Sequence, residues 1–129
     1  MGLDQYAYVV KKTKNIKDIY DNDEKERPFI VNDNLFYWRK NYEIHDWMFE
    51  LAKKKGFKGS DRDFNCAMVC LEKEDIEELI KAIKKRKFSK ERYCDKETFE
   101  MEKERDLNFC GKALQMVIED FAVYYDSWW

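Results

Sequence analysis

The chain has 129 residues and a formal net charge of −2, which fits one domain and leaves no excess of Lys and Arg for general nucleic-acid binding. Its hydrophobic share of 44% and aromatic share of 16% exclude a disordered chain. No apolar run is long enough for a signal peptide or a membrane span, so we expect a cytoplasmic protein that binds no membrane.

An alternating, β-rich pattern at residues 3–10 predicts the first strand. Residues 11–28 are rich in charged and turn-forming side chains, so they predict a mobile, solvated loop or a short, marginal helix. Two short strands are then expected at 29–31 and 35–38, and the Asn-Asp-Asn sequence at 32–34 predicts a turn between them.

Helical periodicity begins at Asn41, and its apolar positions predict a helix that Gly56 ends. Residues 66–71 are apolar on both faces, which is typical of a central strand. A second helix is expected at 74–87, because acidic residues stand in its first turn and basic residues in its last turn. Residues 88–108 show no clear period, and no element is predicted there.

The C-terminal part combines a third helix after Gly111 with a closing strand at 121–129. Strands and helices thus interleave irregularly, without the strand–helix repeat of a parallel α/β protein. We therefore predict a single α+β domain over residues 1–129, with one mostly antiparallel sheet of three to five strands and two or three helices packed on it.

The sequence lacks the common catalytic motifs GxSxG, GxGxxG, P-loop, HExxH and EF-hand. Its four cysteines, at positions 66, 70, 94 and 110, lack the CxxC spacing of zinc sites, so neither a metal nor a cofactor is expected. A cytosolic chain with a sufficient core needs no disulfides, so we expect reduced thiols. A Cys–His nucleophile pair stays open, because His45 could meet Cys66 or Cys110 in space, and burial of these thiols in the core is the competing interpretation.

Aromatic side chains, two cations and the only His gather between a predicted strand and a predicted helix, at residues 36–47. Asn41 and His45 lie four residues apart and share a helix face. A helix N-terminus offers free N–H groups and Arg39 offers a planar fork, so the segment predicts an anion-binding pocket. The alternative is structural: Arg39 pairs with a buried acid such as Asp4, the two Trp residues pack in the core, and His45 is a satisfied residue on the helix flank.

The last residues, 124–129, form a second aromatic cluster. Two Trp residues at a chain end predict either docking on the domain or a surface for a partner. If Tyr125 or Trp128 lies beside the pocket predicted above, the aromatic and cationic side chains form a cleft for a nucleotide-like or acidic ligand.

Four stretches carry a resemblance to a known family: Met1-Gly2-Leu3-Asp4-x-Tyr6, Tyr37-Trp38-Arg39-Lys40-x-x-x-Ile44-His45-x-Trp47, Asn65-Cys66 with Lys73–Leu79, and Tyr124-Tyr125-x-Ser127-Trp128. In order and approximate spacing they resemble small bacteriophage and prophage proteins, and the central stretch is the specific part. Residues 11–34 and 88–110 lie outside the match, and position 5 holds Gln where relatives often have Met. The resemblance implies a phage setting, and it implies roles for Asp4, Tyr37, Trp38, Arg39, Lys40, Ile44, His45, Tyr125, Ser127 and Trp128.

Together these patterns favour a non-catalytic binding protein that a phage deploys in the host cytoplasm to inhibit a defence or regulatory system. It would cap a host protein or sequester a small anionic or nucleotide signal. The expected binding residues are Asp4, Tyr37, Trp38, Arg39, Asn41, His45, Tyr125, Ser127 and Trp128. Two alternatives stay open: a small enzyme in which Arg39 orients an anion and His45 transfers a proton, and a structural or virion-related protein that self-associates through its terminal aromatics.

Overall fold

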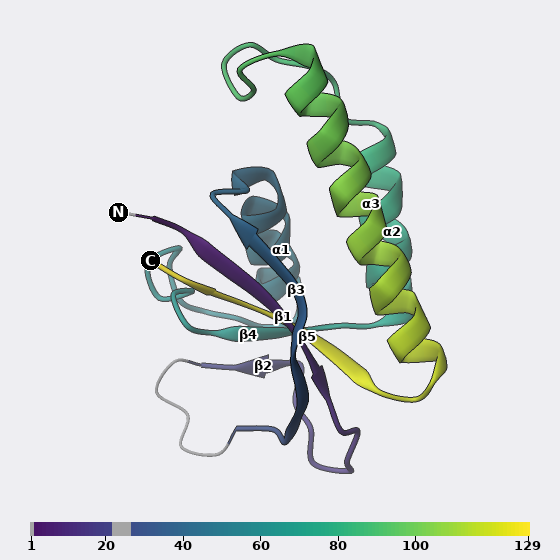
Figure 1. Cartoon of the computed structure of the whole chain (residues 1–129). Coiled ribbons are helices and arrows are strands. Elements are labelled where there is room, and N and C mark those ends of the chain that lie inside the picture. Colours follow the sequence, from purple (N-terminus) through teal and green to yellow (C-terminus); the bar gives the residue numbers. More distant parts are fainter. Residues whose placement is uncertain (1, 22–26) are drawn as a thin grey trace.

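The computed structural model describes residues 2–21 and 27–129, and these residues form five strands and three helices (Figure 1). In chain order the elements are β1 (Asp4–Val10), β2 (Ile19–Tyr20), β3 (Ile30–Arg39), α1 (Tyr42–Lys54), β4 (Met68–Leu71), α2 (Lys73–Lys84), α3 (Lys96–Ile118) and β5 (Ala122–Trp128). The strands pair in the order β2-β4-β5-β1-β3, and every one of these pairings is antiparallel. The predicted α+β fold with one antiparallel sheet is confirmed.

The first and last strands of the chain lie side by side in the sheet (Figure 1). Their register places Gln5 opposite Ser127 and Ala7 opposite Tyr125. β4 lies between β2 and β5 with all four of its side chains buried, as its two apolar faces predict. On each face of the sheet, side chains of the first strand therefore lie beside side chains of the last strand.

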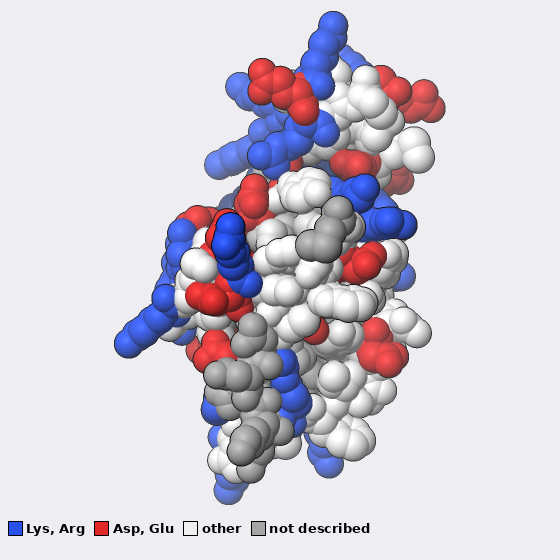
Figure 2. All heavy atoms as spheres, turned by 90° about the vertical axis from the view of Figure 1, so that its left-hand side faces the viewer, with Lys and Arg blue, Asp and Glu red and all other residues white. Residues whose placement is uncertain are grey.

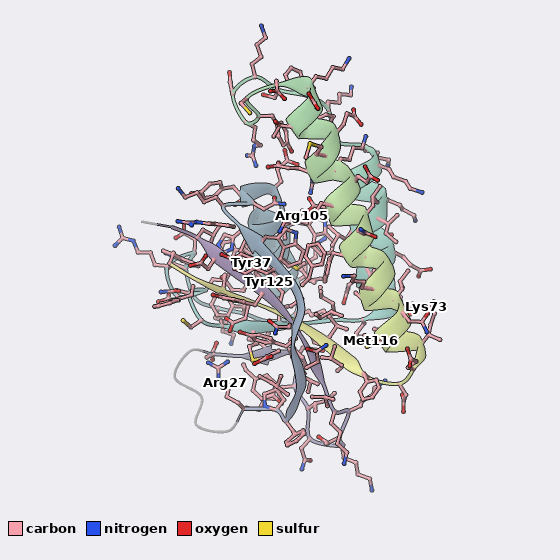
Figure 3. The ribbon with its side chains drawn as sticks, in the orientation of Figure 1. Arg27, Tyr37, Lys73, Arg105, Met116 and Tyr125 are labelled. Atoms are coloured by element: carbon pink, nitrogen blue, oxygen red, sulfur yellow. The ribbon has the colours of Figure 1, made fainter. Side chains whose placement is uncertain are left out.

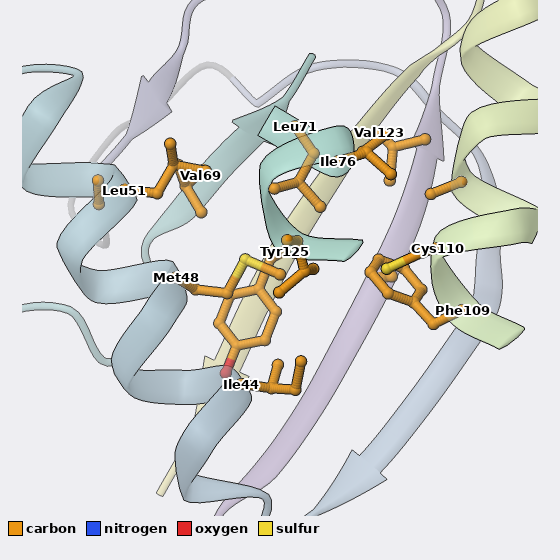
Figure 4. Close-up of a cluster of buried hydrophobic side chains, with 14 of the residues drawn as sticks. Ile44, Met48, Leu51, Val69, Leu71, Ile76, Phe109, Cys110, Val123 and Tyr125 are labelled. Atoms are coloured by element: carbon orange, nitrogen blue, oxygen red, sulfur yellow. The ribbon is translucent and has the colours of Figure 1, made fainter. Parts of the chain in front are cut away.

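All three helices pack against one face of the sheet, and Figure 4 shows part of the resulting core. Alternate side chains of β1, β4 and β5 point toward the helices. The labelled members of this core are Ile44, Met48, Leu51, Val69, Leu71, Ile76, Phe109, Cys110, Val123 and Tyr125. Burial of this apolar surface stabilises the fold by roughly 25 cal/mol per Å² removed from water.

The opposite face of the sheet carries a smaller core, made by Val10, Tyr20, Met68, Cys70, Ala122 and Tyr124. Part of the segment before β2 packs on it through Ile16. The Tyr124 hydroxyl donates to the backbone carbonyl of Lys17, which ties this segment to the sheet. The predicted loop at 11–28 thus contains a short strand, and its residues 22–26 lie outside the described part.

β3 differs from the prediction of two short strands and a turn. It is a single strand whose register against β1 is interrupted between Ala7 and Val9. Asn32 Oδ1 accepts a hydrogen bond from the backbone N–H of Asn34 (2.9 Å). The Asn-Asp-Asn sequence therefore forms an irregularity inside the strand, because its side chains bond to the local backbone.

α3 begins earlier than predicted and includes much of the segment at 88–108. Asp95 caps it by accepting from the backbone N–H of Thr98 (2.7 Å). Its buried face is narrow and contains the charged residue Asp106, so the apolar period is hard to recognise in the sequence. Gly111 lies inside this helix and does not begin it.

The other two helices confirm the predictions with small shifts of their ends. Gly56 follows the end of α1 with φ of 106°, a conformation that glycine adopts without steric cost. α2 starts at Lys73 and ends at Lys84, and its terminal acidic and basic residues match the helix dipole.

The described ranges hold no helix that is both long enough and apolar enough to span a bilayer. All four cysteines fall within these ranges and are free thiols. Within residues 2–21 and 27–129, no three or more His, Cys, Asp and Glu side chains are grouped to hold a metal ion.

Replacement of Met48 by Ala tests the main core. Met48 is fully buried between α1 and the sheet, so Met48→Ala should lower the free energy of unfolding by about 2–5 kcal/mol. Met101→Ala is the matched control, because Met101 is 64% exposed on α3, and it should change stability by no more than about 0.5 kcal/mol. Urea denaturation followed by Trp fluorescence measures both, and equal effects would contradict the assigned core.

Candidate functional site

The segment that joins β3 to α1 is divided between the two faces of the sheet. Side chains alternate along a strand, so Trp38 points into the helix-covered core, whereas Tyr37 and Arg39 point to the opposite face. Lys40 has φ of 57° at the turn, and Asn41 then caps α1 by accepting from the backbone N–H of Ile44 (3.1 Å). The expected anion pocket is therefore not formed by Arg39 and the helix N-terminus together.

A buried carboxylate, Asp106 of α3, holds this segment in place. It has no exposed surface. Trp38 Nε1 donates to its Oδ1 (2.9 Å), and Asn41 Nδ2 donates to both carboxylate oxygens (3.0 and 3.1 Å). Arg86 Nη1 donates to Oδ2 at 2.5 Å and supplies the opposite charge, while its Nε contacts Glu43. The side-chain donors of Trp38 and Asn41 are therefore engaged in hydrogen bonds to a buried residue of the protein itself.

A chain of hydrogen bonds continues from Asn41 to His45. Gln5 Oε1 accepts from the backbone N–H of Asn41 (2.8 Å), which fixes the orientation of the amide. Gln5 Nε2 then donates to the Asn41 carbonyl (2.9 Å) and to the Tyr125 hydroxyl (3.0 Å). Gln5 is a donor in this bond, so His45 Nδ1, 2.9 Å from the hydroxyl, is the acceptor available for the Tyr125 proton. On this network we assign the neutral His45 tautomer with its proton on Nε2.

The environment of His45 favours the neutral imidazole. Burial lowers the pKa of His45 below its ordinary value, and the nearby carboxylates Asp46 and Asp61 oppose this effect without overcoming it. His45 is therefore a neutral donor at neutral pH.

A pocket of about 300 Å³ lies beside His45. We call it the His45 pocket; it is lined by Leu3, Tyr42, His45, Asp46, Phe49, Asp61, Arg62 and Trp129. The four residues from α1 are spaced i, i+3, i+4 and i+7, so they form one stripe of the helix. The Trp129 ring meets the His45 ring edge to face with centroids 5.0 Å apart.

The two terminal Trp residues differ in their contacts and in their exposure to solvent. Trp129 is held on the domain by Asn65, whose Oδ1 accepts from the Trp129 N–H and whose Nδ2 donates to the Trp129 carbonyl (both 3.1 Å). Trp128 is 61% exposed and lies on the other face of β5. One terminal Trp therefore docks, and its neighbour is open to solvent.

The face of the sheet away from the helices carries a second cluster of site residues. We call it the tyrosine face and define it as Asp4, Tyr6, Tyr8, Tyr37, Asp126 and Trp128. The register places Asp4 between Arg39 of β3 and Trp128 of β5, and Tyr6 between Tyr37 and Asp126. Figure 2 looks onto the side of the molecule where both chain ends lie and shows a continuous uncharged area there, bordered by acidic and basic side chains.

Hydrogen bonds organise the tyrosine face. The Tyr37 hydroxyl donates to Asp4 Oδ1 (2.5 Å), and the Tyr8 hydroxyl donates to Asp126 Oδ2 (3.3 Å). Burial raises the pKa of Asp126 to about 6, so this carboxyl loses its negative charge in mildly acidic solution. Arg105 of α3 donates to the Tyr37 carbonyl (2.5 Å), and Figure 3 shows the two residues near each other.

Eight of the nine sequence-predicted residues are therefore separated into two groups. Asp4, Tyr37, Arg39 and Trp128 lie on or beside the tyrosine face, and Trp38, Asn41, His45 and Tyr125 belong to the hydrogen-bonded chain on the helix side. Ser127 is fully buried, and its Oγ has no hydrogen-bond partner among the described residues. Buried Trp38 and Ser127 present no atom to a ligand.

Sequence reasoning missed three members of the tyrosine face, namely Tyr6, Tyr8 and Asp126. The alternation of the first strand could have identified the two Tyr residues, because it puts both on one face. The Cys–His nucleophile pair is not assembled: within the described residues His45 bonds to neither Cys66 nor Cys110, and burial raises the pKa of both thiols, that of Cys110 to about 12.

Comparisons of the chain with family models, with curated proteins and with solved structures gave no match.

Replacement of Asp106 by Asn tests the buried network. Asp106→Asn keeps the size of the side chain but removes the fully buried carboxylate that pairs with Arg86 and leaves the guanidinium only its pair with Glu43, so the free energy of unfolding should fall by about 3 kcal/mol. Glu104→Gln, an exposed change of the same kind on the same helix, should have almost no effect. Urea denaturation compares the two variants, and a neutral Asp106→Asn would contradict the role given to this carboxylate.

The protonation of His45 can be measured without assignment, because the chain contains one His. The NMR titration midpoint of His45 should lie below 6.5, because burial disfavours the charged imidazolium. Between the lowered pKa and 6.5 the unfolded chain binds more protons, so the contribution of His45 to stability should decrease as the pH falls. A midpoint at or above 6.5 in the folded protein would contradict the effect of burial assigned to His45.

Proposed function

We propose that the protein is a non-catalytic binding protein whose tyrosine face binds a basic surface of a partner protein. The observation that carries the proposal is that three Tyr residues, one Trp and two carboxylates are grouped on the side of the sheet that the helices leave uncovered. Tyr37 and Trp128 are 43% and 61% exposed, so both rings are accessible to a partner.

The chemistry of the tyrosine face favours a protein partner. Tyr and Trp are enriched in the energetically dominant centres of protein interfaces, where they supply large contact areas. Asp4 and Asp126 add negative charge at the middle of the cluster, so the complementary surface is basic. Arg39 at the margin of the face repels a basic partner surface only weakly, because its side chain is exposed and solvated.

The setting of the interaction follows from the resemblance to phage proteins. Four residues of the shared stretches, Asp4, Tyr37, Arg39 and Trp128, meet on or beside this face although they come from three strands. We therefore propose that the partner is a host protein in the cytoplasm of an infected cell, and that binding inhibits a defence or regulatory system. A non-catalytic role is supported by the separation of Arg39 from His45, the pair on which an enzyme would have depended.

Site-specific photocrosslinking in infected cells tests the proposal. A chain carrying p-benzoylphenylalanine in place of Tyr37 should give one crosslinked host protein, and the same substitution of Met101 on α3 should not, because only Tyr37 lies on the tyrosine face. Trp128→Ala should weaken binding of the identified partner by about 30-fold, as expected for a central aromatic contact. The affinity of the wild type for this partner should fall as the salt concentration rises. The affinity of Asp4→Asn should fall less over the same range, because one of the negative charges is missing.

Three results would contradict the proposal. The first is equal crosslinking at positions 37 and 101, which would show non-specific contact. The second is a crosslinked species of twice the chain mass, which would indicate self-association. The third is unchanged affinity in Trp128→Ala, which would place the interface elsewhere.

A further inference from the structure

We propose that the His45 pocket binds a guanidinium group. This inference goes beyond the proposed function, since no residue of the pocket belongs to the tyrosine face. The pocket opens beside α1 on the helix side of the sheet, so occupants of the two sites do not compete for the same side chains.

The size and lining of the pocket suit a small planar group. Its volume of about 300 Å³ is at the lower end of the range for ligand sites in proteins. The walls include the rings of Tyr42, Phe49 and Trp129. Aromatic faces attract cations, Trp most strongly, and guanidinium also stacks on them because it is planar and weakly hydrated.

The charges around the pocket favour a cation over an anion. Asp46 and Asp61 contribute two carboxylates and Arg62 contributes one guanidinium, while His45 is neutral. Arg92 approaches Asp46 only to 3.9 Å, and it lies at a similar distance, 3.8 Å, from Glu43. The Asp46 side chain is 66% exposed, so its oxygens remain accessible to a second cation.

The geometry further predicts that the ligand carries a hydrogen-bond acceptor close to its guanidinium group. Because Tyr125 occupies His45 Nδ1, the donor left on the ring is Nε2–H, and it has no partner among the described residues. An arginine within a peptide supplies a carbonyl oxygen beside its cationic side chain, whereas agmatine supplies the same guanidinium without a carbonyl. The two sources of guanidinium can therefore be distinguished.

Calorimetry and NMR with small probes test the inference on the full chain. N-acetyl-arginine-N-methylamide should bind at least about 10-fold more tightly than the citrulline analogue, which has nearly the same shape but no charge. Binding should shift the ring signals of His45, the single His of the chain. A tighter complex with the arginine amide than with agmatine identifies peptide arginine as the source, and the reverse order identifies a free guanidinium compound.

Charge-neutral variants provide the control. Asp46→Asn with Asp61→Asn should weaken binding of the arginine amide by about 10-fold and leave the citrulline analogue unchanged. Glu100→Gln with Glu104→Gln makes the same change of net charge at exposed positions of α3 and should have no effect. If the first double variant fails to fold, the His45 shifts in the wild-type chain still decide the question. Equal binding of the arginine and citrulline probes, or no shift of the His45 signals at millimolar arginine amide, would overturn the inference.

Discussion

The carboxylate of Asp106 lies entirely inside the protein, and the arrangement of β3, α1 and α3 depends on it. A charge in such a position is tolerated only when hydrogen bonds and an opposite charge replace water. Trp38, Asn41 and Arg86 provide them from β3, from the N-terminal cap of α1 and from the segment after α2. α3 is thereby held against the turn between β3 and α1, and the same hydrogen bonds fix the conformation of this turn.

The same network also controls hydrogen bonding in the His45 pocket, although Asp106 does not line that pocket. Asn41 positions Gln5 through two backbone hydrogen bonds, Gln5 orients the Tyr125 hydroxyl, and Tyr125 selects the tautomer of His45. Figure 4 shows the Tyr125 ring in the core with its hydroxyl directed toward α1. A structural hydrogen-bond chain therefore determines which nitrogen His45 offers to an incoming group, and residues that never touch a ligand set the donor pattern of the site.

Much of the fold could be predicted because strands and helices with one buried face carry clear periods. The first and last strands, the central strand at 66–71 and the helix whose period begins at Asn41 follow from local patterns. The start of α3 could not be predicted, since its core-facing side includes Asp106, whose partners lie 20 to 68 residues away in sequence. The site was predicted as one cluster because neighbours in sequence were treated as neighbours in space, although alternation places Trp38 and Arg39 on opposite faces.

The end of the chain links the two proposed binding surfaces through a single strand register. Asp126 and Trp128 face the tyrosine face, while Tyr125 and Trp129 contact His45 on the helix side. A shift of β5 by one residue would exchange these sets, so both surfaces require the same pairing with β1. That pairing is fixed by burial of Val123 and Tyr125 in the core and by the two Asn65 hydrogen bonds to Trp129. Core packing and terminal docking thus hold both binding surfaces in one arrangement, and neither can be rebuilt without disturbing the other.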